Sequence, residues 1–199
     1  MIAASCHDAR VAEHPWPLQS GPLILRDAAE PDIEAMLALR NDPASNRWTL
    51  HTSVDPEQFR TGWLREPDGR DYSCVAELDG VVVGLGFLEV KDGLGQSAMP
   101  PATEAEIGYL VGPQFSGRGI ATHLAKGLLE ACFGPLGLRR ATAGCYADHG
   151  ASARVLEKAG MRREQHGVED SWHDELGWID GYTYGLLARE WQQQRTGAA

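Results

Sequence analysis

Apolar and polar residues alternate in several short runs of the chain, which is the pattern of half-buried β-strands. Two such runs flank Asp79-Gly80, a dipeptide that strongly favours a two-residue hairpin turn. A third run places Ile107, Tyr109 and Val111 on one face. The pattern predicts strands at residues 23–26, 72–78, 81–90, 104–111 and 140–147, and two more within residues 161–187 that are joined by a long acidic connection.

Helices are predicted where apolar residues recur every three or four positions. The clearest stripe is Ile120, Leu124, Leu128 and Cys132, and a later helix stops at Gly160, a typical C-terminal residue. About four helices are expected, at residues 31–40, 55–64, 120–136 and 152–159. Antiparallel strands followed by a strand–helix–strand unit indicate a mixed α/β (α+β) fold.

The length of 199 residues suits one domain with a substantial core. We expect residues 1–20 to be a loosely ordered extension, residues 21–190 to form the domain, and residues 191–199 to be a polar tail. The extension lacks the apolar centre of a secretion signal, and no apolar run approaches the roughly 18 residues that span a membrane. These features predict a cytoplasmic protein without a membrane partner.

The net charge indicates which kinds of partner to expect, and the cysteine spacing indicates whether disulfides are expected. The formal net charge is −10, which disfavours nucleic acid and favours a cationic partner. The four cysteines show no paired CxxC spacing, so we interpret them as small core residues or free thiols. They are Cys6, Cys74, Cys132 and Cys145.

A glycine-bearing loop joins the strand at residues 104–111 to the helix that begins near Ile120. Gly117 and Gly119 flank Arg118 in this loop. Backbone N–H groups at a helix start lack partners, and together with the helix dipole they favour an anion such as a pyrophosphate. The spacing fits neither the dinucleotide-binding GxGxxG nor the nucleotide-binding P-loop, and a turn without a ligand would look the same.

The run from Pro113 to Ala121 resembles the acetyl-coenzyme A loop of the Gcn5-related N-acetyltransferases (GNAT), whose pattern is Gln/Arg-x-x-Gly-x-Gly/Ala. Residues 148–161 are similar to that family's second signature, Asn-x-x-Ser-x-x-x-x-x-Lys-x-Gly-Phe. Residues 180–186 resemble the last strand of the branch that acetylates the N-termini of ribosomal proteins. Ser116 and His149 depart from the usual Gln and Asn, and Met161 replaces the usual aromatic residue.

The resemblance implies a GNAT fold with antiparallel N-terminal strands and a splayed central parallel pair. It also implies that acetyl-CoA is the cosubstrate, with its pantetheine arm between the splayed strands. The residues implied to bind it are Tyr109, Leu110, Val111, Ser116, Gly117, Arg118, Gly119, Ile120, Ala121, Thr122, His149 and Ser152.

Acetyl transfer to an amine needs a base for the ammonium proton, a donor for the oxyanion and an acid for the departing thiolate. Glu106 is the leading base and Glu104 the second candidate, since both share a strand face with Gly108; a solvated carboxylate without a role is the alternative. By the resemblance Ser152 is the thiolate acid, although a helix N-cap is equally compatible. Tyr146 is the other candidate donor, or else a packed aromatic residue.

The segment of residues 164–180 combines acids and histidines without the HExxH spacing of a zinc site, so no metal is expected. Its acids could instead line a site for a cationic amine. The candidate side chains are His166, Glu169, Asp170, His173 and Asp174, with Trp48, Trp63, Trp172 and Trp178 as walls of such a site.

The leading hypothesis is therefore an acetyl-CoA-dependent N-acetyltransferase that transfers acetyl directly to a primary amine. The ending at residues 180–186 favours the α-amine of a protein, whereas the acidic surface favours a polyamine or an aminoglycoside. A non-catalytic acyl-CoA-binding module stays open because of Ser116 and His149. A homodimer also stays open.

Overall fold

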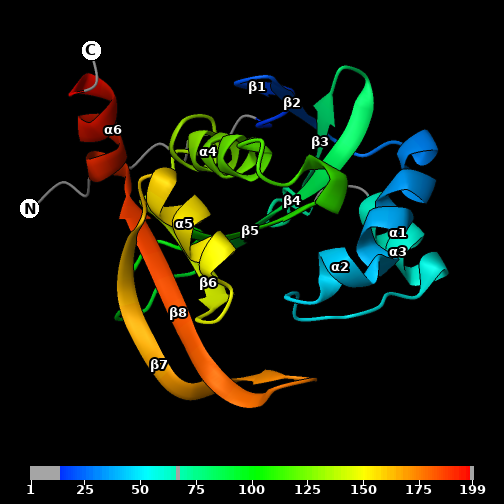
Figure 1. Cartoon of the computed structure of the whole chain (residues 1–199). Coiled ribbons are helices and arrows are strands. Elements are labelled where there is room, and N and C mark those ends of the chain that lie inside the picture. Colours follow the sequence, from blue (N-terminus) through cyan, green and yellow to red (C-terminus); the bar gives the residue numbers. More distant parts are fainter. Residues whose placement is uncertain (1–13, 66–67, 198–199) are drawn as a thin grey trace, which may run out of the picture.

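The structure, a computed structural model, describes residues 14–65 and 68–197 and contains one mixed sheet. Among these residues the sheet has eight strands in the order β1-β2-β3-β4-β5-β6-β8-β7 (Figure 1). Every neighbouring pair is antiparallel except β5 and β6. The strands are β1 (Leu18–Ser20), β2 (Leu23–Arg26), β3 (Cys74–Leu78), β4 (Val81–Lys91), β5 (Glu104–Val111), β6 (Arg140–Tyr146), β7 (Arg162–His173) and β8 (Gly177–Leu187).

Six α-helices occur in the described part of the chain, rather than about four. Two of the short ones begin at aspartate caps: the Asp42 carboxylate accepts from the N–H of Ala44 and Ser45, and that of Asp55 from Gln58. The helices are α1 (Ile33–Asn41), α2 (Pro43–Asn46), α3 (Pro56–Trp63), α4 (Ile120–Phe133), α5 (Gly150–Lys158) and α6 (Ala188–Thr196), with 3₁₀ turns η1 (Glu30–Asp32) and η2 (Pro113–Phe115).

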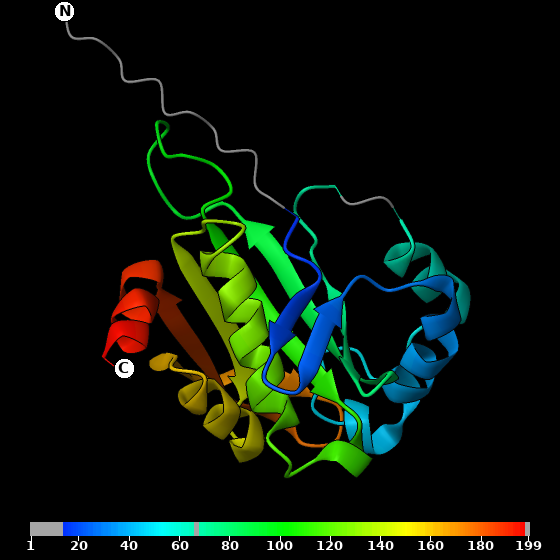
Figure 2. The same cartoon turned by 90° about the horizontal axis from the view of Figure 1, so that it is seen from above.

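The two faces of the sheet carry separate cores. Leu124 and Leu128 of α4 pack with Leu88 on one face, in the core that also contains Leu156 of α5. Residues of α1 and α3 pack with Leu85 on the other face. Figure 2 shows α4 lying along the sheet, while α1, α2 and α3 gather at its other side. The predicted single mixed α/β domain is confirmed.

The C-terminal third of the chain differs from its prediction. The expected long acidic connection does not exist, because β7 and β8 form one long hairpin joined through Asp174, Glu175 and Leu176, and the acids lie within and beside the strands. One face of this hairpin is exposed and polar, and a polar run of this kind in the sequence is typical of a loop. The polar tail from residue 191 is helical in α6, where Trp191 packs on Phe133 at 5.6 Å between ring centroids.

The structure also places the end of the expected N-terminal extension and three of the four cysteines. Leu18–Ser20 pair with β2 inside the sheet, whereas residues 1–13, and Cys6 with them, lie outside the described residues. Cys74 and Cys132 are buried free thiols, and Cys145 is half-buried. No helix in the described part of the chain is both long and apolar enough to cross a membrane.

Candidate active site

The parallel strands β5 and β6 separate after three paired positions. Their register is Glu104↔Arg140, Ala105↔Ala141 and Glu106↔Thr142. Beyond Glu106, β5 stays paired with β4 as far as Val111, and β6 stays paired with β8 as far as Tyr146. The backbone of residues 107–111 that faces β6 is therefore without a ladder partner and can bind an extended chain. We call this wedge between the two strands the opening.

The glycine loop lies at the wide end of the opening. Gly117 and Gly119 adopt left-handed backbones, with φ of 76° and 79°. A Cβ at either position would meet no atom within 4 Å, so conformation rather than crowding requires glycine at both. The first bond inside α4 is donated by His123 to Gly119, which leaves the N–H groups of residues 120–122 free for an anion.

Tyr109 and Ser152 meet across the opening. The Tyr109 hydroxyl lies 2.9 Å from Ser152 Oγ and donates to the Ser152 carbonyl at 3.2 Å. Burial raises the pKa of Tyr109. Ser152 is the third residue of α5, whereas the N-cap position belongs to His149. The alternative role of Ser152 as the helix N-cap therefore does not apply. The phenol of Tyr109 at this site was not foreseen, because only its backbone was implied.

Glu106 and Glu104 lie at the narrow end, where β5 and β6 are still paired. The Glu106 carboxylate forms an ion pair with Lys91, and this hydrogen bond raises the pKa of Lys91. Glu104 pairs with Arg139 and Arg140. By strand alternation, Glu106 and Gly108 face α1–α3, whereas Tyr109 faces α4 and α5. The candidate base and the hydroxyl pair thus lie on opposite faces of the opening.

An aromatic cluster links the turn after α2 to the end of β6, the N-cap of α5 and the end of β7. Trp48 stacks on His149, with ring centroids 5.2 Å apart and planes 11° apart. It also lies 4.8 Å from His173 and 5.9 Å from Tyr146. Burial, together with the charge of Arg154, lowers the pKa of His149, which favours the neutral ring.

Backbone contacts fix two members of this cluster. Glu175 N–H donates to His173 Nδ1 at 3.2 Å, so Nε2 carries the proton that is donated to the Arg47 carbonyl at 3.0 Å. The Tyr146 hydroxyl donates to the Trp172 carbonyl at 2.8 Å. The side chain of Tyr146 is buried, and its hydroxyl proton is donated to a backbone carbonyl, as that of Tyr109 is. The contact of His173 with Arg47 joins residues 126 positions apart, and no local sequence pattern predicts it.

A cavity of about 750 Å³ lies on the α1–α3 face of the sheet. Its inner wall includes Phe87, which stands directly opposite Gly108 of β5. A Cβ at Gly108 would meet only the Phe87 side chain, at 3.7 Å, so the surface above this glycine is open. The walls combine aromatic rings with two carboxylates, namely Phe59, Trp63, Tyr72, Phe87, Asp27 and Asp71.

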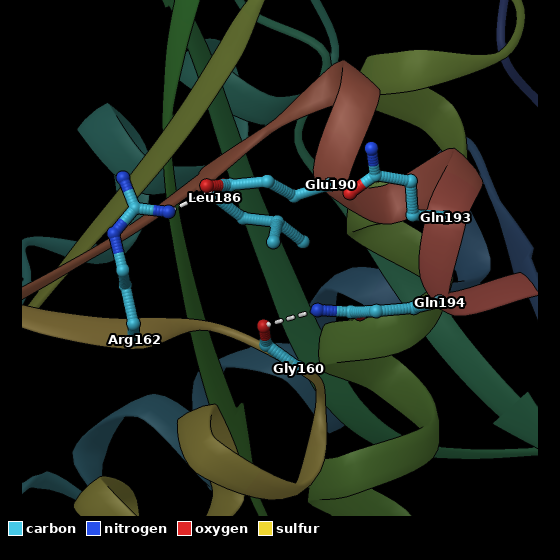
Figure 3. A pocket seen from close by; sticks show the side chains of 6 residues that line it. All are labelled: Gly160, Arg162, Leu186, Glu190, Gln193 and Gln194. Carbon is cyan, nitrogen blue, oxygen red and sulfur yellow. Dashed lines mark hydrogen bonds and ion pairs between the residues drawn. The ribbon is translucent and has the colours of Figure 1, made fainter. Parts of the chain in front are cut away.

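A second cavity, of about 430 Å³, lies away from the opening, between the end of α5, the start of β7 and α6 (Figure 3). Gln194 crosses it to donate to the Gly160 carbonyl at 3.0 Å. None of the predicted site residues lines it. Within residues 14–65 and 68–197 no three His, Cys, Asp or Glu side chains are grouped as they would be to hold a metal ion.

The chain is similar in sequence to an acetyltransferase family and to two proteins named as N-acetyltransferases. A family model for the acetyltransferase (GNAT) domain matches residues 22–162. The chain is 35% identical over 86 residues to the uncharacterized N-acetyltransferase YnaD of Bacillus subtilis, an alignment that covers 43% of the chain and only 50% of that relative. It is 28% identical over 152 residues to YoaA of the same bacterium, also an uncharacterized N-acetyltransferase, with 74% of the chain and 83% of the relative covered.

Solved structures give the same fold. Mycobacterium smegmatis RimJ in complex with CoA-disulfide superposes with a TM-score of 0.73 at 26% identity, over 88% of this chain and 90% of that one. Spermidine N-acetyltransferase from Vibrio cholerae, in complex with CoA and spermine, gives a TM-score of 0.75 over 86% of this chain and 98% of that one. At 18% identity the second likeness concerns the fold alone.

Proposed function

The chain belongs to the GNAT N-acetyltransferase family, and from this premise we propose that it transfers acetyl from acetyl-CoA directly to the α-amine of a polypeptide. One observation carries the proposal: the opening between β5 and β6, which has the glycine loop at its wide end and the Tyr109–Ser152 pair across it. A free strand edge and an adjacent helix N-terminus suit an extended thioester arm that is joined to a pyrophosphate.

The residues that would hold acetyl-CoA fit its chemistry. The free N–H groups of residues 120–122 and the left-handed Gly117 and Gly119 offer backbone to the pyrophosphate, and Arg118 adds a charge near it. The unpaired edge of residues 109–111 offers hydrogen bonds to the arm. When bound, acetyl-CoA supplies the activated acetyl group.

Proton transfers are divided between the two faces of the opening. On the α1–α3 face Glu106 takes the proton of the incoming ammonium group, directly or through one water molecule. Lys91 neutralises this carboxylate in the structure, so the acceptor amine competes with the lysine for it. On the α4–α5 face Ser152 donates a proton to the thiolate. The Tyr109 hydroxyl, which contacts Ser152 Oγ, is a second source of that proton.

Two features support a polypeptide acceptor. Residues 180–186 resemble the last strand of the ribosomal-protein branch, and β8 pairs with β6, the strand that forms one side of the opening. A small cationic amine is the second candidate, because the cavity beside Phe87 carries the carboxylates of Asp27 and Asp71 among its aromatic walls, where the amine would compete with Arg65 for Asp71.

Release of free thiol from acetyl-CoA, measured with a panel of peptides, polyamines and aminoglycosides, tests the proposal. We expect turnover with peptides that have a free α-amine and none with the same peptides N-acetylated. Turnover only with small amines would replace the proposed acceptor. Saturable binding of CoA without thiol release on any amine would instead indicate a non-catalytic acyl-CoA-binding module.

A further inference from the structure

Arg40 is the only buried arginine in the described part of the chain, with an exposed fraction of 6%. It lies in the last turn of α1, on the same helix face as Ile33 and Met36, which pack onto the sheet. Burial lowers the pKa of Arg40, yet a guanidinium keeps its charge in proteins. Because buried charges are ordinarily paired, the surroundings of this side chain indicate what it binds.

No carboxylate among the described residues neutralises Arg40. Its one hydrogen bond there runs from Nη1 to Thr49 Oγ1, at 3.2 Å. The acid nearest in sequence, Asp42, accepts from the N–H groups of Ala44 and Ser45 instead. Nε and Nη2 are not sealed off, because Ser45 Oγ is the only fully enclosed side-chain nitrogen or oxygen in this part of the chain without a hydrogen-bond partner. The guanidinium therefore has free N–H groups that a ligand can reach.

Helix α1 crosses the strands of the sheet and ends beside the opening. Before its first residue, Asp32 accepts two hydrogen bonds from Arg26 at the end of β2, at 2.7 and 2.9 Å. Near its last residue, Leu39 lies against the end of β5, since a Cβ at Gly112 would be 2.8 Å from Leu39 Cδ2. Arg40 is the next residue, so it is held at the wide end of the opening, on the α1–α3 face.

The hydrogen-bond partner of Arg40 belongs to a turn that spans this wide end. Thr49 follows Trp48, whose ring stacks on His149 and lies 5.9 Å from the ring of Tyr146 at the end of β6. The side chain of Arg40 thus extends from the β5 side of the opening toward its β6 side. Figure 1 shows α2, which leads into this turn, between α1 and α5. An anion bound to the free N–H groups of Arg40 would lie at the wide end of the opening.

A carboxylate fits this guanidinium well, because its two oxygens match the fork of N–H groups. The pyrophosphate of CoA is assigned to other N–H groups, those of residues 120–122 at the start of α4. Glu106, the proposed base for the acceptor amine, lies on the same face as Arg40. It is five residues from the end of β5, about 17 Å. The side chain of Arg40, one or two acceptor residues and a water molecule at the base together cover that length.

We propose that Arg40 binds a carboxylate that the acceptor carries close to its reacting amine. This inference rests on the proposed function and adds a substrate class, namely polypeptides with an acidic first or second residue. The ion pair orients the acceptor on the α1–α3 face, with its amine toward Glu106. The α-carboxylate of a free amino acid has the same chemistry, and the experiment below distinguishes the two sources.

Matched peptides test the assignment. One pair has Glu or Gln as the first residue and another has Glu or Gln as the second, before the same neutral tail. We expect kcat/KM to be about tenfold higher for the acidic member of at least one pair. This preference should disappear in Arg40→Met and persist in part in Arg40→Lys, which keeps a charge. An acidic preference that survives unchanged in Arg40→Met would overturn the proposal.

Melting temperatures distinguish a binding role from a structural one. Arg40→Met replaces a buried unpaired charge with an apolar side chain, so it should melt no lower than the original protein. Arg189→Met is the control, because Arg189 is an exposed arginine of α6, away from the opening, and both the preference and the melting temperature should stay unchanged. A lower melting temperature of Arg40→Met, with equal losses of kcat/KM for both members of a pair, would indicate a structural role and overturn the proposal.

A free amino acid and its α-amide identify the source of the carboxylate. Turnover of the free amino acid but not of its amide, lost in Arg40→Met, would keep Arg40 as the carboxylate site and replace the polypeptide acceptor. Equal turnover of these two compounds, together with a ratio of one for both peptide pairs, would overturn the proposal.

Calorimetry on the protein saturated with CoA makes the test independent of turnover. The N-acetylated Glu peptides should bind more tightly than their Gln counterparts, and this difference should vanish in Arg40→Met. If no amine is acetylated, the proposed function fails, and this binding difference decides the role of Arg40 by itself. Equal affinity for the Glu and Gln peptides would then overturn the assignment.

Discussion

The side of the site that we assign to the cofactor and the side that we assign to the acceptor are built from different parts of the polypeptide. The cofactor side consists of backbone: left-handed glycines, free N–H groups at the start of α4 and the unpaired edge of β5. The acceptor side consists of side chains brought from the turn after α2 and from α3, β4, β5 and β7. A backbone site tolerates few changes of sequence, whereas a side-chain site can change its ligand without a change of fold. GNAT relatives can therefore share one cosubstrate and differ in their amines.

The backbone side should show the largest effect of a single change. Gly119→Asp forces a side chain onto a backbone with φ of 79° and places a negative charge at the helix start. We expect affinity for CoA, measured by calorimetry, to fall about 100-fold. Gly137→Asp is the matched control, because Gly137 also has a positive φ and open space around it but lies far from the loop. Unchanged affinity in Gly119→Asp would remove the loop from the cofactor site.

Glu106→Gln tests the acceptor side, where one side chain should govern rate and not cofactor affinity. Removal of the base should lower kcat about 100-fold near neutral pH. The deficit should shrink as rising pH deprotonates the amine by itself. Glu89→Gln is the control, since Glu89 stands opposite Glu106 and also contacts Lys91, at 3.4 Å. A pH–rate profile like that of the original enzyme would exclude Glu106 as the base.

Ser152→Ala tests the proposed proton donor to the thiolate, which lies across the opening from Tyr109. We expect kcat to fall about tenfold with CoA affinity preserved, because a thiolate donor acts in the transition state. The expected loss of kcat is smaller than for Glu106→Gln because the Tyr109 hydroxyl stays nearby. The double variant Tyr109→Phe/Ser152→Ala should therefore have a lower kcat than Ser152→Ala alone. The melting temperature should hardly change, since Ser152 is not the N-cap. A lower melting temperature with an unchanged rate per folded molecule would instead indicate a structural role.

The smallest expected effect concerns pH and the aromatic cluster. The pKa of His149 is lowered in the folded protein, so the unfolded chain binds more protons as the pH falls through about 6.5, and stability is lost there. His149→Asn, which restores the residue usual in the family signature, should remove this part of the pH dependence. The measurement is the difference between the two proteins in unfolding free energy at neutral and at mildly acidic pH. Parallel curves would contradict the buried neutral imidazole.

The same contrast explains what the sequence could predict. The strands of the first half, the main helices and the glycine loop follow from local patterns, because alternation and glycine spacing act over a few residues. The Trp48–His149–His173 cluster joins the turn after α2 to the N-cap of α5 and to β7, and the ion pair of Glu106 with Lys91 depends on the register of β4 with β5. Neither has a local signature. Two strands within residues 161–187 were predicted, but the extent of β7 and its short turn to β8 were not, because the polar and acidic residues of β7 have the composition of a loop.

Mass spectrometry that follows the acetyl group itself tests the central claim most directly. The protein is incubated with isotope-labelled acetyl-CoA and a peptide that has a free α-amine and a lysine-rich tail, and fragmentation of the peptide locates the label. The proposed site predicts label on the α-amine with the original protein and little with Gly119→Asp or Glu106→Gln. A peptide that stays unlabelled while the protein is saturated with the cosubstrate, or that is labelled only on lysine side chains, would contradict it.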